Sequence, residues 1–252
     1  PKYRDVTRAA AVALFAKRSK LDLLGTKIDA LTGEWLGKRA TIGSYADSYY
    51  EYLWDSWELF GDAEMRRMYR VLTDAILKHQ SDRHEGRLWF ADVDMDTGQR
   101  LNTRQDELGS FYGGLLAQGG DRAAGVAYTE SWSALQDRFG ILPEEWDYLA
   151  GVPTQKGNAL RPELADAAFN HWLLDRDERW RELTATHFRN MVRWNKAAYG
   201  YADMADVTTK TQADHCPGYW WSEQMKYYWL IFADTPRFDY RSNVLSTEGN
   251  VL

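Results

Sequence analysis

The sequence predicts an all-α protein built from helical hairpins, and three observations support that prediction. Apolar residues recur at helical spacing along most of the 252 residues. Short breaks that contain glycine or aspartate divide the helical segments into pairs. A marker aspartate stands at one break of each pair, at Asp62, Asp121, Asp177 and Asp234, with spacings of 59, 56 and 57 residues. A fixed period indicates one repeated unit of two helices that buries its apolar face against its neighbours.

The elements follow from this pattern in chain order. Helices are expected over residues 5–20, 46–60, 63–79, 107–118, 122–138, 163–174, 178–197 and 218–232. The two- and three-residue breaks make the two helices of each pair antiparallel neighbours. The longer links between pairs are expected to hold β-ribbons, one over Leu88 to Val93 that turns at residues 96–98, and one around Tyr201 to Thr208.

Composition excludes several classes of function. The chain has 31 Lys and Arg against 37 Asp and Glu, a net charge of −6, so no basic face for nucleic acid is expected. The longest all-apolar run, residues 9–16, is too short to cross a bilayer. The single cysteine, Cys216, allows no internal disulfide. The five histidines lack zinc-ligand spacing, and no Walker, dinucleotide or G-x-S-x-G pattern occurs.

Four acidic residues stand where the first helix of each pair begins. Asp47, Glu107, Glu163 and Glu223 precede the marker aspartates by 15, 14, 14 and 11 residues, so they share the end opposite the short turns. Acidic residues also favour first helical turns because of the helix dipole, and that reading suffices for any one of them. Aromatic residues adjoin each of the four, however, which capping does not require. The set therefore favours a carboxylate site.

Carboxylates beside aromatic rings suit glycoside hydrolysis, in which one carboxyl protonates the leaving oxygen and another activates water or attacks. Tyr219 and Trp220 are the candidates for stacking on a sugar, whereas Trp54 and Trp57 are expected in the core.

Four motifs, in order, resemble glycoside hydrolase family 47, the class I α-1,2-mannosidases. They are residues 42–53 (IGSYADSYYEYL), 160–163 (LRPE), 221–232 (WSEQMKYYWLIF) and 246–248 (STE). The resemblance covers essentially the whole chain and implies an (α/α)7 barrel of helical hairpins. It also implies an α-mannoside oligosaccharide as the partner and Ca²⁺ as the cofactor.

The resemblance implies roles residue by residue. Glu163 would be the general base that activates water in an inverting mechanism, and Asp47 a second catalytic carboxylate near the water or the leaving group. The residues implied to bind substrate are Arg161, Glu223, Tyr219, Asp166, Glu107 and Phe111. Thr247 would bind Ca²⁺ through its carbonyl and hydroxyl, and Glu248 through water.

Some positions depart from the family pattern. Cys216-Pro217 stands where the family has Met-Glu, Gly249-Asn250 where it has Ala-His, and Glu107 where classical members have His. This drift resembles the divergent bacterial branch and the endoplasmic-reticulum degradation branch. With no N-x-S/T sequon, the sequence fits a bacterial source, which would favour a periplasmic or secreted protein.

Seven repeats of about 57 residues need roughly 400 residues, whereas this chain holds about four repeats. The expectation is therefore that residues 1–252 are the C-terminal portion of one barrel domain, with the N-terminal half and the general acid upstream. The leading hypothesis is a Ca²⁺-dependent inverting exo-α-1,2-mannosidase. The alternatives are an inactive mannose- or glycoprotein-binding module of the same fold and, more weakly, a sugar epimerase.

Overall fold

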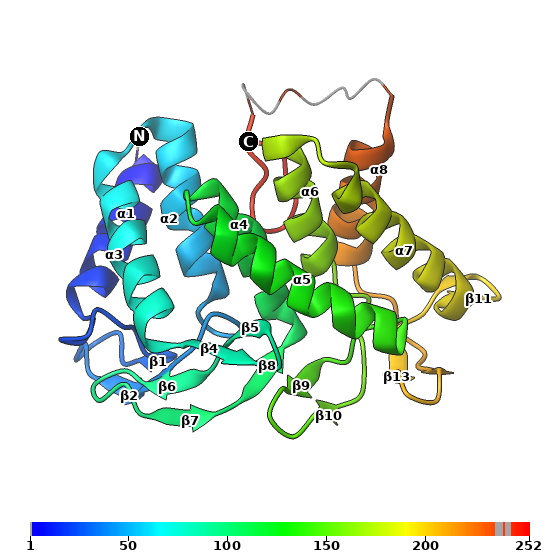
Figure 1. The fold of residues 1–252 in the computed structure, drawn as a ribbon. Helices are drawn as coiled ribbons and strands as arrows, with labels where there is room; N and C mark the ends of the chain where they lie inside the picture. The colour runs from blue at the N-terminus through cyan, green and yellow to red at the C-terminus, as the bar shows by residue number, and fades with distance from the viewer. Residues whose placement is uncertain (1, 235–238, 240–242) are drawn as a thin grey trace. The chain divides into compact units, whose positions relative to one another are not determined.

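The computed structural model describes residues 2–234, 239 and 243–252, which form eight α-helices and a set of short β-hairpins (Figure 1). The chain divides into two compact units. Unit 1 comprises Pro1–Asp82 and Phe90–Thr103, and unit 2 comprises Arg83–Trp89 and Arg104–Leu252. In the described ranges, no helix has both the length and the apolar character needed to cross a membrane.

Unit 1 is built on one helical hairpin with a third helix beside it. The helices are α1 (Lys2–Ala16), α2 (Asp47–Phe60) and α3 (Ala63–His79). Gly61 ends α2 in the left-handed conformation, with φ 63°, and Asp62 caps α3 by accepting from the backbone N–H groups of Glu64 and Met65. The predicted break therefore works as expected, because glycine adopts positive φ without strain and aspartate satisfies free helix donors.

The strands of unit 1 form two antiparallel sheets. β1 (Lys27–Ile28) pairs with β2 (Trp35–Gly37), and β3 (Arg39–Ala40), β6 (Asp92–Asp94) and β7 (Arg100–Asn102) form a sheet in the order β3-β6-β7. The predicted ribbon over Leu88 to Val93 is in fact two strands. β5 (Arg87–Phe90) pairs with β4 (Ser81–His84), and β6 pairs with β7 around the predicted turn.

Unit 2 holds two helical hairpins and the start of a third pair. A 3₁₀ turn, η1 (Glu107–Phe111), leads into α4 (Tyr112–Gln118), which is followed by α5 (Arg122–Phe139), α6 (Glu163–Asp175) and α7 (Glu178–Trp194). A π-helical turn, η2 (Trp220–Gln224), leads into α8 (Met225–Phe232). Helices α4 and α5 touch backbone to backbone, because a Cβ on Gly125 would lie 2.4 Å from the Gly113 carbonyl oxygen.

The remaining strands link the helices of unit 2. β8 (Arg104–Asp106), β9 (Glu145–Asp147) and β10 (Val152–Gln155) form a sheet in the order β10-β9-β8. The hairpins β11 (Lys196–Ala197) with β12 (Gly200–Tyr201) and β13 (Met204–Asp206) with β14 (Thr211–Gln212) follow α7. Strand β13 lies within the second predicted ribbon.

Four hairpin tips share a turn that the sequence analysis missed. In each, an aspartate Oδ1 accepts from the backbone N–H groups two and three residues later; the four are Asp29, Asp94, Asp147 and Asp206. The residue four places after each aspartate has positive φ, and three of these are glycines while the fourth is Lys210. The sequence signal was D-x-x-x-G.

The marker aspartates divide into two groups. Asp62 and Asp177 cap the helices that follow them, whereas Asp121 precedes α5 without a side-chain bond to that helix. Asp234 follows the end of α8, and residues 235–238 lie outside the described part of the chain. The period therefore identified three hairpin breaks correctly, and the capping explanation holds at two of them; at Asp234 only the end of α8 is described.

Candidate functional site

The start of α6 carries three of the predicted site residues in unit 2. Arg161 precedes the helix, Glu163 begins it, and Asp166 lies one turn further on. The Arg161 guanidinium donates to both carboxylate oxygens of Glu144, from Nε at 3.3 and 3.1 Å and from Nη2 at 3.0 Å. Both side chains of this ion pair are about one-quarter exposed or less. Arg161 is therefore held in a fixed direction by a forked charge pair.

Glu144 is a site residue that the sequence analysis missed. It stands just before β9, outside the register of helix starts, and no motif marks it. Besides pairing with Arg161, its Oε1 accepts from the backbone N–H of Ala159 at 2.6 Å. Glu144 thus links the β9 region to the loop that leads into α6.

The carboxyl group of Glu163 is buried beside this ion pair. Its Oε2 is buried and has no hydrogen-bond partner among the described residues. Burial raises the pKa of Glu163 to about 8, although the Arg161 charge acts to lower that pKa. Burial alone would lower the pKa of Arg161, but Glu163 and Glu144 raise it above its usual range. Desolvation therefore outweighs attraction at Glu163, which is mostly protonated at neutral pH in the absence of a bound cation.

Asp166 accepts a hydrogen bond from one amide side chain, which a second amide side chain holds in place. The Asn170 amide donates to Asp166 Oδ1 at 3.1 Å, and Gln118 Nε2 donates to Asn170 Oδ1 at 3.0 Å. Burial raises the pKa of Asp166 to about 7, and the bond from Asn170 opposes that shift. The amide chain runs from α4 to α6 and fixes the orientation of the carboxyl group.

The π-helical turn η2 presents Glu223, which is 7% exposed. Burial, together with the nearby carboxyl groups of Glu163, Glu248 and Asp166, raises the pKa of Glu223 to about 9. Mutual electrostatic influence shows that these acids from α6, η2 and the C-terminal loop share one site. Because π-turns insert an extra residue into a helix, the turn changes the direction in which Glu223 points.

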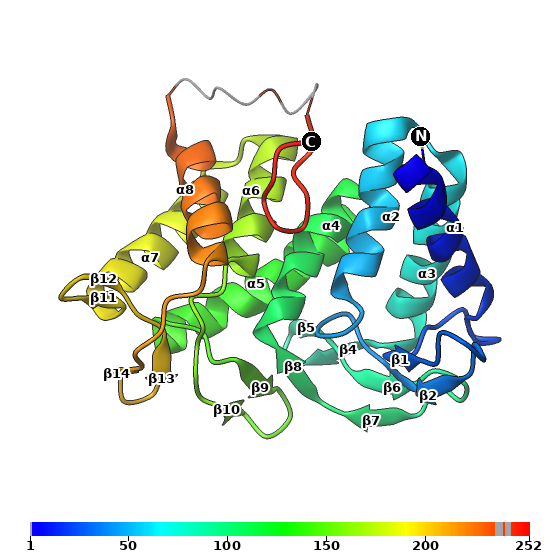
Figure 2. The ribbon, with the colours of Figure 1, turned by 180° about the vertical axis from the view of Figure 1, so that it is seen from behind.

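The C-terminal loop packs against the start of α8. The C-terminal loop, drawn in red, lies beside α6 in Figure 2, and the Lys226 ammonium donates to the Gly249 carbonyl. Gly249 has φ +67°, and a Cβ there would lie 3.0 Å from Glu223 Cγ. The side chains of Glu223 and Glu248 are hydrogen-bonded to each other. Glycine thus allows the loop to approach Glu223 closely.

Thr247 offers two oxygen atoms in this loop. Within the described ranges, neither its hydroxyl nor its carbonyl has a hydrogen-bond partner. Oxygen donors of this kind fit Ca²⁺, which takes six to eight oxygen ligands. The described residues contain no cluster of three or more His, Cys, Asp and Glu side chains suited to a metal ion.

Glu107 and Phe111 lie below the surface. Glu107 is fully buried and Phe111 is 3% exposed. Burial raises the pKa of Glu107 well above its usual range, and Glu144 and Glu163 raise it further. Their burial leaves them almost no surface for a ligand, so substrate binding at these two positions stays a prediction.

Asp47 lies in unit 1, at the start of α2. Its Oδ1 accepts from the backbone N–H of Ser48 at 2.5 Å and from the Ser48 hydroxyl at 2.8 Å. Its catalytic role likewise stays a prediction, since the structure describes Asp47 only within its own unit.

The aromatic candidates behave differently from one another. Tyr219 is half-buried, and its hydroxyl donates to the Ala159 carbonyl at 2.6 Å. Trp220 is 1% exposed within a core cluster, so the expectation that it stacks on a sugar is wrong. The adjacent Trp221 is 65% exposed. Sequence spacing alone did not distinguish the buried tryptophan from the exposed one. As expected, Trp54 is buried, whereas Trp57 is only partly buried.

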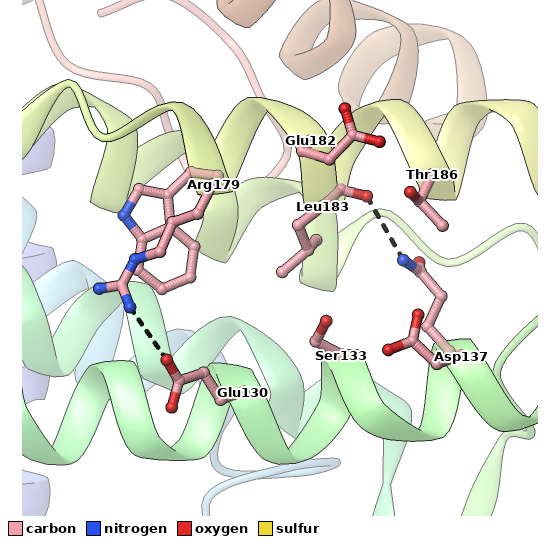
Figure 3. A pocket seen from close by; sticks show the side chains of 9 residues that line it. Glu130, Ser133, Asp137, Arg179, Glu182, Leu183 and Thr186 are labelled. Carbon is pink, nitrogen blue, oxygen red and sulfur yellow. Dashed lines mark hydrogen bonds and ion pairs between the residues drawn. The ribbon is translucent and has the colours of Figure 1, made fainter.

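A hollow of about 400 Å³ lies between α5 and α7 (Figure 3). Arg179 bridges it to Glu130 at 3.0 Å, and the Gln136 amide donates to the Leu183 carbonyl at 3.3 Å. None of the predicted site residues lines it.

Named α-mannosidases are similar to this chain in sequence. "Alpha-mannosidase I MNS5" of Arabidopsis thaliana is 32% identical over 254 residues, which cover 100% of this chain and 43% of that protein. "Mannosyl-oligosaccharide 1,2-alpha-mannosidase" of Candida albicans is 28% identical, with 87% of this chain and 47% of that protein covered. The chain therefore spans less than half the length of these relatives.

The solved structures show the fold. The chain superposes on the alpha-1,2-mannosidase from Trichoderma reesei with a TM-score of 0.83 at 19% identity, covering 100% of this chain and 61% of the fungal chain. The predicted fold class, part of a barrel of helical hairpins, is confirmed by this likeness. The family model described as "Glycosyl hydrolase family 47" matches residues 1–252. The chain belongs to glycosyl hydrolase family 47.

Proposed function

We propose that this chain carries the water-activating half of the active site of an inverting exo-α-1,2-mannosidase. The observation that carries the proposal is that Glu223 lies near Glu163 and Asp166, that Glu163 lies near Arg161, and that one Glu163 oxygen is unpartnered in the described structure. A carboxylate of this kind can take a proton from water as the water attacks the sugar. The names of the relatives, which are α-mannosidases, point to mannosides as the substrates.

Each residue has a distinct part in this proposal. Glu163 is the general base, and Arg161 and Glu223 bind the hydroxyl groups of the terminal mannose. Asp166 acts nearby through a water, and Tyr219 stacks on the sugar. Asp47 is the second catalytic carboxylate.

The decisive experiment replaces the base with its isosteric amide. Glu163→Gln in the native protein, with any residues that flank this chain, should lower kcat for mannobiose by roughly 10²- to 10⁴-fold, because the amide cannot accept the proton. The matched control is Glu178→Gln, since Glu178 also begins a helix but is exposed. Near-normal turnover by Glu163→Gln would remove Glu163 from the base role.

Calcium is the proposed cofactor, bound through the carbonyl and hydroxyl of Thr247 with Glu248 acting through water. The unpartnered oxygens of Thr247 fit a cation that prefers neutral and anionic oxygen. When bound, Ca²⁺ would hold sugar hydroxyls and favour a distorted ring. Its charge would also lower the pKa of the buried carboxyls and so ionise Glu163.

Calorimetric titration with Ca²⁺ tests the cofactor. Thr247→Val removes the hydroxyl at nearly constant shape and should weaken Ca²⁺ binding by about tenfold, which is about 1.4 kcal/mol. Thr186→Val, on α7, is the control and should bind Ca²⁺ like the wild type. Equal affinity in all three proteins would place the metal elsewhere.

The alternative is a mannose-binding module without turnover. It is favoured by the raised pKa values of Glu163 and Glu223, which leave the base uncharged near neutral pH in the absence of a cation. Calorimetry with mannobiose, followed by product analysis, separates the two functions. Binding without release of mannose, with Ca²⁺ present, would establish the module.

A further inference from the structure

Asn158 is the most highly connected residue of the loop that leads into α6, although no motif marks it. It is 5% exposed, and its backbone pairs with Met204 through two hydrogen bonds, N–H to O at 2.9 Å and O to N–H at 2.8 Å. The backbone of Asn158 is therefore fixed to strand β13 on one side. Its side chain is free to act on the other side.

All the hydrogen-bonding groups of that side chain are used. Nδ2 donates to Glu107 Oε2 at 2.6 Å and to the Leu142 carbonyl at 2.9 Å. Oδ1 accepts from the backbone N–H of Leu160 at 2.9 Å. The side-chain amide thus joins Glu107, Leu142 and Leu160, while the backbone of the same residue is bonded to Met204.

Leu160 is the residue whose conformation needs this support. Its φ is +54°, in the left-handed region that costs a leucine roughly 1 to 2 kcal/mol, and it is 1% exposed. The bond from its N–H to Asn158 satisfies a buried donor in that conformation. Because Leu160 directly precedes Arg161, its backbone direction sets where Arg161 and then Glu163 point.

Glu107 anchors the amide from below. It is fully buried, and in the described structure its Oε1 has no hydrogen-bond partner. Its own backbone N–H donates to the Glu144 carbonyl at 2.9 Å. Burial and the charges of Glu144 and Glu163 raise the pKa of Glu107, and the hydrogen bond from Asn158 to Oε2 acts to lower it.

We propose that Asn158 is a positioning residue for Arg161 and Glu163, and that buried Glu107 acts through Asn158 as its anchor. The two side chains act as a pair, which we call the Glu107–Asn158 pair. The Asn158 amide can hold Leu160 firmly only while Glu107 holds the amide. The inference rests on the proposed function for its consequence in catalysis, but the positioning itself is a property of the loop.

A double-mutant cycle on the native protein tests whether Glu107 and Asn158 act as a pair. Glu107→Ala and Asn158→Ala should each lower kcat for mannobiose about 100-fold, as expected when a catalytic group is displaced by about 1 Å. The double variant should lose about 100-fold as well, because either change already releases the loop. Glu107→Gln keeps an acceptor for Asn158 and should lose less than tenfold. Additive losses, near 10⁴-fold in the double variant, would overturn the proposal.

Asn195→Ala is the matched control. Asn195 is also a buried asparagine of unit 2, and its amide holds the Ala202 carbonyl at 2.9 Å. Its loss should lower stability without lowering kcat more than about twofold. A fall in kcat equal to that of Asn158→Ala would make the effect one of general destabilisation and would refute the positioning role.

Hydrogen exchange provides a readout that does not depend on turnover. The amides of Ala159 and Leu160 are bonded to Glu144 and Asn158, so they should be protected in the wild type and in Asn195→Ala. Protection should fall at least tenfold in Glu107→Ala and Asn158→Ala. If the wild type released no mannose, the proposed function would fail. The exchange pattern would still support or overturn the positioning role of the Glu107–Asn158 pair. Unchanged protection in both variants would overturn it.

Discussion

The first turns of α2 and α6 hold acids at the same place in the repeat but in different surroundings. Asp47 begins α2 in unit 1, and its carboxylate is satisfied locally by the backbone and hydroxyl of Ser48. Glu163 begins α6 in unit 2, where it is surrounded by other acids and by Arg161, and its pKa is raised to about 8. Position in the repeat is therefore not enough to define what a carboxyl does.

The difference follows from the residues that surround each helix start. Asp47 is followed by a serine, whose backbone N–H and hydroxyl both donate to the Asp47 carboxylate. Glu163 is followed by Leu164, which donates none from its side chain, and Glu144 and Asp106 add negative charge nearby. A carboxylate at the first site therefore has its hydrogen-bond donors in the next residue. A crowded, buried one keeps its proton until a cation or substrate arrives.

The largest expected effect tests whether Asp47, which is hydrogen-bonded to Ser48, also acts in catalysis. Asp47→Asn should lower kcat by roughly 10²- to 10⁴-fold if its charge acts on the water or the leaving group. The Asn side chain keeps the oxygen that accepts from Ser48, so the free energy of unfolding should change by less than about 1 kcal/mol. The measurements are steady-state kinetics on mannobiose and urea unfolding. Unchanged kcat would reduce Asp47 to a helix-start residue.

A smaller effect should follow from removing the counter-ion of Arg161. Glu144→Gln keeps an acceptor for Ala159 but leaves a half-buried guanidinium without its charge partner, which should cost about 1 to 3 kcal/mol in urea unfolding. The adjacent Glu145 pairs more loosely with Arg104, at 3.5 Å. Glu145→Gln should therefore cost at most about 1 kcal/mol. Equal losses in the two variants would contradict the special role of Glu144.

The smallest effect is on the pH dependence of stability without added metal. A carboxyl whose pKa is raised on folding contributes stability that is complete below its unfolded pKa and is lost as pH rises through its folded pKa. The pKa of about 8 for Glu163 places part of that loss between pH 7 and 9, at about 1 kcal/mol. Glu163→Gln should make the free energy of unfolding less dependent on pH in this window.

Buried histidines do not interfere with that measurement. Burial lowers the pKa of His171 and of His187 to about 4, so their contribution to stability changes below pH 7. Glu178→Gln, at an exposed helix start, should retain the wild-type slope between pH 7 and 9. A wild-type slope that Glu163→Gln leaves unaltered would show that Glu163 does not titrate there.

The helices were predictable because their signals are local. Apolar spacing and the Gly-Asp break place α3 at 63–79 in both the prediction and the structure. Strand boundaries were less predictable, since Ala91 interrupts the expected ribbon and its two halves pair with different strands. Pairing depends on residues far along the chain, which a local pattern does not contain.

The sequence by itself determined the hairpin repeat, the acids at the helix starts and, through its motifs, the family. Each of these depends on spacing or on residue identity, which can be read along the chain. Only the tertiary structure decided the partner of Arg161, the burial of Trp220, the amide of Asn158 under Leu160 and the protonation of Glu163. Those properties arise when distant segments meet and exclude water, because burial sets both the cost of a charge and the need for a hydrogen-bond partner.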